Sequence, residues 1–207
     1  FHRRLYRSTD AMLGKLLEEV GDDTLVILVS DHGSKADGTT FNPTEALIDA
    51  GLMVVDENAE PSEAMKPALK NLSPEQAAQG LAEPIIEKSK AFPQRSCFIY
   101  VNLKGRYPGG IVEPEDYYKV QREIIDALYT YVEPRTGRRP IALALTKEDA
   151  LLLGMGGEQC GDVVYTCYPE YGAQHGPILS TAKWGIGDLH TMSVFYGPGI
   201  KKGFEME

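Results

Sequence analysis

The feature that most constrains the fold is a short apolar run at residues 24–30, which is rich in β-branched side chains. The run is continuous rather than alternating, so it predicts a strand buried on both faces, as in parallel sheets. Apolar residues recur at helical spacing over residues 3–20 just before it, and they predict an amphipathic helix. Gly21 is expected to end that helix. A helix followed by a buried strand is typical of an α/β fold.

The rest of the chain continues this alternation. Strands are predicted at residues 97–103, 141–145, 162–166 and 192–196, and helices at residues 42–51, 114–132 and 146–149. We therefore expect an α/β fold with a mostly parallel sheet flanked by helices. Residues 56–93 contain five prolines and little periodicity. This stretch, to about residue 95, is predicted to be a helical insertion or surface elaboration with no core element.

Composition limits the possible functions. The 207 residues carry 21 Lys and Arg against 30 Asp and Glu, a formal charge of −9, which disfavours nucleic-acid binding by bulk charge. No apolar run approaches the ~20 residues of a membrane-spanning helix. An acidic protein can still bind a phosphate ester where a metal ion supplies positive charge. The three cysteines form no CxxC pair, so neither a disulfide framework nor a Cys-rich zinc site is predicted.

The most informative motif is Ser30-Asp31-His32-Gly33, directly after the predicted buried strand. Ligands of open α/β sheets bind beyond the carboxyl ends of the strands. Asp31 offers a carboxylate oxygen and His32 an imidazole nitrogen, both of which Zn²⁺ accepts. A capping aspartate beside a hydrogen-bonded surface histidine is the alternative interpretation.

A second histidine motif, Gln174-His175-Gly176, lies in a predicted loop. His175 is a candidate third metal ligand, because metal ligands converge from separate loops, although a loop histidine is more often structural or solvated. His190 could contact substrate or support the site, but a structural histidine is the favoured interpretation. His2 lies on the first predicted helix, where a surface histidine is the default.

Several segments resemble, in order, the type I phosphodiesterase/nucleotide pyrophosphatase family of the alkaline phosphatase superfamily. The matching residues are Tyr6-Arg7, Asp10 and Gly14; Ser30-Asp31-His32-Gly33; Asn42, Leu47 and Gly51; residues 99–106 with Gly110-Ile111-Val112; Gln174-His175-Gly176; and residues 197–203. The resemblance covers most of the chain outside residues 56–93. It implies that the chain is the C-terminal portion of a single alkaline-phosphatase-like catalytic domain.

The resemblance also implies a mechanism. Two divalent metal ions, Zn²⁺ by expectation, would bridge the phosphoryl group of a small phosphate-ester substrate. Asp31 and His32 would bind one metal ion and His175 the other. A Thr or Ser nucleophile would attack phosphorus. The resemblance places that nucleophile and the remaining ligands upstream of this chain, which alone should therefore be incomplete as a catalyst.

Other interpretations remain open at the level of sequence. Phosphomonoesterases, sulfatases, phosphonate hydrolases and phosphotransferases of the same superfamily share these ligands. A non-catalytic relative of the fold could act as a binding or scaffold protein. A plain α/β domain with a coincidental Asp-His pair is a third alternative.

Overall fold

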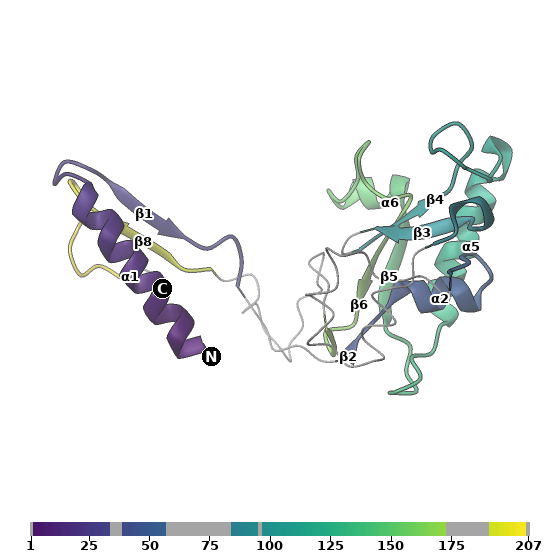
Figure 1. The fold of residues 1–207 in the computed structure, drawn as a ribbon, viewed down its shortest axis with the longest axis horizontal. Helices are drawn as coiled ribbons and strands as arrows, with labels where there is room; N and C mark the ends of the chain where they lie inside the picture. The colour runs from purple at the N-terminus through teal and green to yellow at the C-terminus, as the bar shows by residue number, and fades with distance from the viewer. Residues whose placement is uncertain (1, 34–38, 57–83, 95–96, 173–190, 206–207) are drawn as a thin grey trace. The chain divides into compact units, whose positions relative to one another are not determined.

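The computed structural model describes residues 2–33, 39–56, 84–94, 97–172 and 191–205. These residues fall into two units (Figure 1). The smaller unit contains residues 2–33 and 191–205, and the larger unit contains the other described ranges. No helix of the described residues is long and apolar enough to cross a membrane.

The smaller unit consists of one helix and a two-stranded ribbon: α1 (His2–Glu19), β1 (Val26–Val29) and β8 (Ser193–Tyr196). All three elements were predicted. The predicted surroundings of β1 are wrong, however, because β1 pairs antiparallel with β8, with Val26 opposite Tyr196. Ile27 and Val29 are 51% and 64% exposed, so β1 is not buried on both faces within the described residues. An apolar run specifies a strand, but it does not specify the direction of the partner strand.

The larger unit is built on a four-stranded sheet. Its elements are, in chain order, β2 (Thr39–Thr40), α2 (Pro43–Asp49), η1 (Ile86–Lys88), β3 (Ala91–Gln94), β4 (Phe98–Val101), η2 (Pro114–Asp116), α5 (Tyr117–Thr130), β5 (Ile141–Thr146), α6 (Lys147–Leu152), β6 (Val163–Cys167) and β7 (Tyr171–Gly172). The sheet order is β3-β4-β6-β5, and β2 pairs separately with β7.

The mixture of helices and strands confirms the predicted α/β class of fold. The prediction of a mostly parallel sheet is wrong for the described strands. Every neighbouring pair in the four-stranded sheet is antiparallel, and only β2 and β7 run parallel among the named pairs. The alternation of strands and helices along the sequence led to this wrong prediction, because α6 lies within the connection between two antiparallel strands, β5 and β6. A helix between two strands therefore does not by itself require a parallel crossover.

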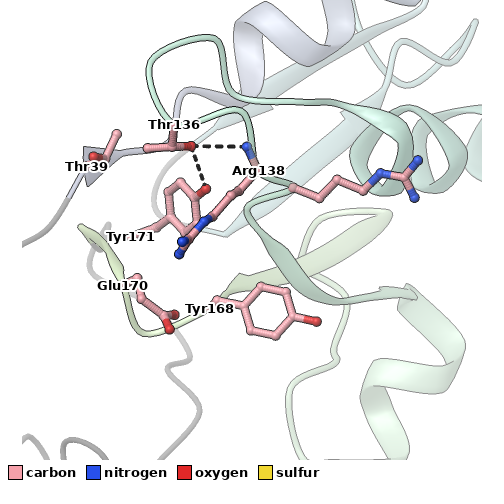
Figure 2. A pocket seen from close by; sticks show the side chains of 7 residues that line it. Thr39, Thr136, Arg138, Tyr168, Glu170 and Tyr171 are labelled. Carbon is pink, nitrogen blue, oxygen red and sulfur yellow. Dashed lines mark hydrogen bonds between the residues drawn. The ribbon is translucent and has the colours of Figure 1, made fainter.

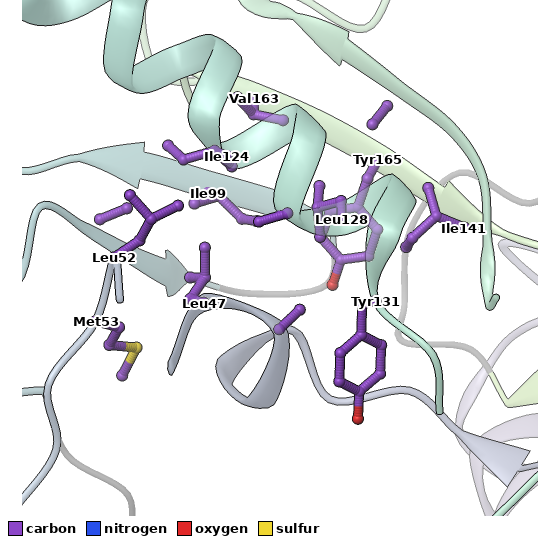
Figure 3. Packing of buried hydrophobic residues seen from close by; sticks show 14 of the residues in the cluster. Leu47, Leu52, Met53, Ile99, Ile124, Leu128, Tyr131, Ile141, Val163 and Tyr165 are labelled. Atoms are coloured by element: carbon purple, nitrogen blue, oxygen red, sulfur yellow. The ribbon is translucent and has the colours of Figure 1, made fainter. Parts of the chain in front are cut away.

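One face of this sheet carries the main hydrophobic core. Ile124 and Leu128 of α5 are fully buried and pack with Ile99 of β4 and Val163 of β6 (Figure 3). Leu47 of α2 is also fully buried in this cluster. The apolar side of α5, predicted from its helical periodicity, is thus the side that covers the sheet.

The opposite face has a smaller cluster beneath α6. Ala150 of α6 packs with Cys97 and Val164, which are buried. The side chain of Thr146 caps α6, because its Oγ1 accepts a hydrogen bond from the Asp149 backbone N–H at 3.1 Å. Asn42 caps α2 in the same way, accepting from Thr44 N–H at 3.1 Å. Both residues stand at the first positions of helices predicted from the sequence.

The end of the predicted insertion belongs to the core instead. β3 pairs with β4 along its whole length, and Ala91 is fully buried in the main cluster. The expectation of no core element is therefore wrong for residues 84–94. Pro93 explains why the strand was missed, since proline disfavours a central strand but is tolerated in an edge strand such as β3. Residues 57–83 lie outside the described residues, and the single-domain assignment stays a prediction.

Candidate functional site

The Asp-His motif lies where the β1–β8 ribbon ends. Ser30 extends the ladder by one bond, because its backbone N–H donates to the Met192 carbonyl at 3.0 Å. Its carbonyl accepts from the Thr191 hydroxyl at 2.5 Å, and its own hydroxyl donates to the His32 carbonyl at 2.8 Å. These bonds hold the turn that follows β1, so Asp31 and His32 project from a fixed strand end.

The two side chains of the motif face each other across a short gap. Asp31 Oδ1 accepts a hydrogen bond from the His32 backbone N–H at 3.1 Å. Asp31 Oδ2 lies 3.6 Å from His32 Nε2. The side chains are 81% and 48% exposed, respectively. A solvent-accessible carboxylate and imidazole thus share one small region at the end of β1.

The donor atoms of this pair suit a divalent metal ion. His32 Nδ1 lies 2.6 Å from the Gly33 carbonyl, which can only accept, so Nδ1 carries the hydrogen in the neutral imidazole, and in that tautomer Nε2 has the lone pair that a metal ion needs. Two ligands of one tetrahedral Zn²⁺, each about 2.0–2.2 Å from the ion, lie about 3.3–3.6 Å apart. The Oδ2–Nε2 separation fits that spacing. The carbonyl bond on Nδ1 also orients the ring, as the second nitrogen of metal-bound histidines commonly does.

The predicted third ligand is not placed by the structure. His175 and His190 lie outside the described residues, and the His2 side chain is not described although its backbone begins α1. Within the described ranges, no group of three His, Cys, Asp or Glu side chains could hold a metal ion. The structure therefore brings together Asp31 and His32, and the convergence of His175 on them stays a prediction.

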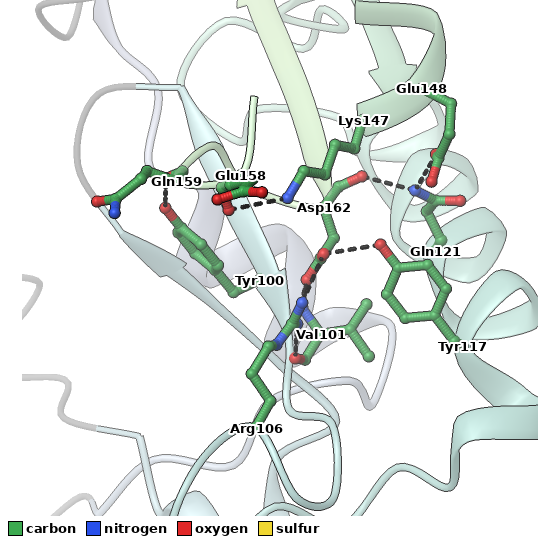
Figure 4. Close-up of polar contacts among 10 residues, drawn as sticks. All are labelled: Tyr100, Val101, Arg106, Tyr117, Gln121, Lys147, Glu148, Glu158, Gln159 and Asp162. Carbon is green, nitrogen blue, oxygen red and sulfur yellow. Dashed lines mark hydrogen bonds and ion pairs between the residues drawn. The ribbon is translucent and has the colours of Figure 1, made fainter. Parts of the chain in front are cut away.

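The larger unit contains a buried polar network that sequence reasoning missed (Figure 4). Its centre is Asp162, which immediately precedes β6 and whose side chain is 1% exposed. Arg106 donates to both carboxylate oxygens, with Nη1 2.9 Å from Oδ1. The Tyr117 hydroxyl donates to Oδ1 at 2.7 Å, and the Val101 backbone N–H donates to Oδ2 at 2.7 Å. A buried carboxylate needs such partners, because desolvation of an unpaired charge is costly.

Several neighbours complete this network. Gln121, which is buried on α5, donates to the Asp162 backbone carbonyl at 2.7 Å and to Glu148 at 3.2 Å. Burial, followed by the hydrogen bond to Asp162, raises the pKa of the Tyr117 hydroxyl. Gly161 allows the close approach of β4, since a Cβ there would lie 2.6 Å from Phe98 Cβ. The network joins β4, β6 and α5 and is therefore an architectural feature of the larger unit.

Asn102 holds together the segment of residues 99–112, which is one of the segments that resemble the family. Asn102 is fully buried, and its Nδ2 donates to the carbonyls of Ile86 and Ser89 at 2.8 and 2.9 Å. The backbone carbonyl of Asn102 accepts from the backbone N–H groups of Ile111 and Val112 at 3.0 and 2.9 Å. For the Asp162 network, the sequence offered one signal: Asp162 itself is a charged residue immediately before the apolar strand of residues 163–167. Its partners Arg106 and Tyr117 are too distant in sequence to be inferred.

The fold and the Asp-His pair define an α/β protein with a candidate divalent-metal site at a strand end. The model of the type I phosphodiesterase/nucleotide pyrophosphatase family matches residues 2–173. The chain belongs to that family, as the ordered motifs predicted. At the level of the family, this assigns the protein to the hydrolases of phosphodiester and pyrophosphate bonds. No curated protein and no solved structure matches the chain.

Proposed function

We propose that this chain supplies part of a two-zinc site that hydrolyses a phosphodiester or pyrophosphate bond in a small phosphate-ester substrate. The observation that carries the proposal is the 3.6 Å separation of Asp31 Oδ2 and His32 Nε2 at the end of β1. Family membership supports the reaction class. His175 is proposed as the ligand that this chain contributes to the second metal ion.

The roles of the chain's own residues follow from their chemistry. Asp31 and His32 would hold one metal ion, with the carboxylate offsetting one of its two positive charges. The Gly33 carbonyl would keep the His32 ring turned so that Nε2 faces the ion. When bound, the metal ions would supply Lewis acidity and stabilise negative charge on the phosphoryl oxygens. That contribution matters here because the chain carries a formal charge of −9 and would otherwise repel an anionic substrate.

Hydrolysis is tested on the complete natural protein, because a Thr or Ser nucleophile is expected upstream of the Ser30–Gly33 motif. The protein is dialysed against EDTA, restored with Zn²⁺ and assayed with bis(p-nitrophenyl) phosphate. We expect activity to depend on Zn²⁺ and to fall at least a hundredfold in His32→Ala. His2→Ala is the matched control and should retain activity. Zn²⁺-independent hydrolysis, or full activity of His32→Ala, would overturn the proposal.

A further inference from the structure

Two hydroxyl groups hold the turn that carries Asp31 and His32. The first belongs to Ser30, and it donates to the His32 carbonyl at 2.8 Å. The second belongs to Thr191, which lies shortly before β8, and it donates to the Ser30 carbonyl at 2.5 Å across 161 positions of the sequence. The turn that bears the proposed metal ligands is therefore tied to a distant segment of the same unit.

These bonds restrain the peptide planes on both sides of the ligand pair. A peptide unit is planar, so the direction of a side chain depends on how the two planes flanking its residue are turned. The Ser30 carbonyl belongs to the plane before Asp31, and the Thr191 hydroxyl holds that plane. The His32 carbonyl belongs to the plane after His32, and the Ser30 hydroxyl holds that one. The plane between the two ligands is held as well, because the His32 N–H donates to Asp31 Oδ1 at 3.1 Å.

Packing contributes little to the geometry of this turn, because the turn is open to solvent. The side chains of Asp31 and His32 are 81% and 48% exposed. Gly33 follows them, and a glycine leaves the backbone more conformational freedom than any other residue does. Hydrogen bonds are therefore the interactions that keep Asp31 Oδ2 at 3.6 Å from His32 Nε2.

The Thr191 hydroxyl restrains a part of the turn that the β1–β8 ladder leaves free. The Ser30 N–H donates to the Met192 carbonyl at 3.0 Å, and this bond holds only the amide side of Ser30. The carbonyl side can still rotate, and Thr191 bonds to it. The hydroxyl has one hydrogen, and the Met192 carbonyl is farther from it, at 3.4 Å, so the Ser30 carbonyl is the preferred acceptor. The branched side chain of threonine also has few χ1 rotamers, which limits the entropic cost of holding the hydroxyl in place.

We propose that Thr191 is a positioning residue of the metal site, an inference that rests on the proposed function. Its hydroxyl holds the Ser30 carbonyl and thereby the peptide plane before Asp31, so that the Asp31 carboxylate stays at ligand spacing from His32. Loss of a group that orients a metal ligand commonly weakens metal binding by about 10- to 100-fold. The segment before β8 thus contributes to metal affinity through the backbone of the turn.

The Zn²⁺ affinity of the 207-residue chain, measured by equilibrium dialysis, tests this role. Thr191→Val keeps the shape of the side chain and removes the hydroxyl, so it should weaken the Asp31-dependent zinc site at least about tenfold. Thr191→Ser keeps a hydroxyl and should restore most of the lost affinity. The matched control is Thr136→Val in the larger unit, because the Thr136 hydroxyl also bonds to a distant group, Tyr171 Oη, at 2.9 Å (Figure 2). This control should bind zinc like the unaltered chain.

Cobalt distinguishes positioning from a general loss of stability. The visible absorption of Co²⁺ at saturation reports the geometry of its ligands, and a variant that is merely less stable keeps the spectrum of the metal-bound chain. We expect Thr191→Val to change this spectrum and Thr191→Ser to preserve it. Undiminished zinc affinity or an unchanged cobalt spectrum in Thr191→Val would overturn this inference and leave the proposed function standing. Zinc binding that Asp31→Asn does not alter would overturn the proposed function and this inference with it.

Discussion

The carboxylate of Asp162 and the guanidinium of Arg106 form an ion pair that joins β6 to the loop after β4, across 56 positions of the sequence. The carboxylate is buried, with 1% of its side chain exposed, and the guanidinium side chain is 31% exposed. Because the hydroxyl of Tyr117 and the backbone N–H of Val101 also donate to Asp162, the carboxylate is fully surrounded by donors.

Removal of this carboxylate charge should destabilise the larger unit. Asp162→Asn leaves Arg106 without its counter-charge, and breaking a buried pair costs about 3–5 kcal/mol. We expect the free energy of unfolding, measured in urea, to fall by about 3 kcal/mol, at the lower end of this range because Arg106 can still reach solvent. The control is Glu123→Gln, which removes a surface pair with Lys90 and should cost less than about 1 kcal/mol. Equal losses of unfolding free energy in the two variants would contradict the claim that the buried Asp162 pair stabilises the larger unit more than a surface pair does.

The Tyr117 hydroxyl should contribute measurably on its own. Tyr117→Phe keeps the ring and removes only the donor to Asp162 Oδ1, so a loss of about 1–3 kcal/mol is expected for a hydrogen bond to a charged acceptor. Tyr118→Phe alters the adjacent ring, which is 64% exposed, and should be neutral. Denaturant midpoints of the two variants provide the comparison. A neutral Tyr117→Phe would show that the bond adds nothing to stability.

The contact between α5 and the sheet should dominate the core. Leu128 is fully buried, and Leu128→Ala should cost about 2–5 kcal/mol through lost burial and the cavity left behind. Leu152→Ala makes the same chemical change at a side chain that is 84% exposed, and it should alter stability by less than about 0.5 kcal/mol. Thermal unfolding checks both variants. Similar melting temperatures for the two would mean that α5 does not cover the sheet as described.

The elements of this fold were predictable where the signals are local. Asn42 and Thr146 stand at helix starts and bond to backbone groups two and three residues away, so the sequence alone indicates them. Strand direction was not predictable, because nothing in the run containing Val26 says that Tyr196 lies antiparallel to it. Asp162 and Arg106 were missed for a similar reason, since pairing over a long chain separation leaves no periodic trace.

In the candidate site, too, local relationships were predictable from the sequence and long-range ones were not. Asp31 and His32 are adjacent, so their proximity was certain, and the structure adds the orientation of the ring through Gly33. The convergence of His175 depends on how distant segments fold together, and it stays a prediction. The ion pair between Arg135 and Glu133 was not noticed in the sequence. Only the structure shows that the carboxylate of Glu133 is buried and that the Arg135 side chain is its partner.

Thiol reactivity should report the packing beneath α6. Burial, followed by proximity to Cys160, raises the pKa of Cys97 from 9.0 to about 11. The folded chain therefore retains a proton that the unfolded chain loses near pH 9, so this thiol's contribution to stability is complete below pH 9 and falls as the pH rises toward 11. Iodoacetamide labelling of Cys97, followed by mass spectrometry, should increase toward pH 11 in the folded chain and near pH 9 in urea. A midpoint near pH 9 in the folded chain would contradict this.

The central claim is that Asp31 and His32 bind a divalent metal ion, and equilibrium dialysis of the 207-residue chain with Zn²⁺ tests it most directly. We predict that Asp31→Asn lowers the bound zinc by one equivalent, or weakens that site at least tenfold, because a charged ligand is replaced by a neutral amide. Asp10→Asn removes an exposed carboxylate of α1 and should leave zinc binding unchanged. Identical zinc binding by the Asp31→Asn variant and the unaltered chain would contradict the account.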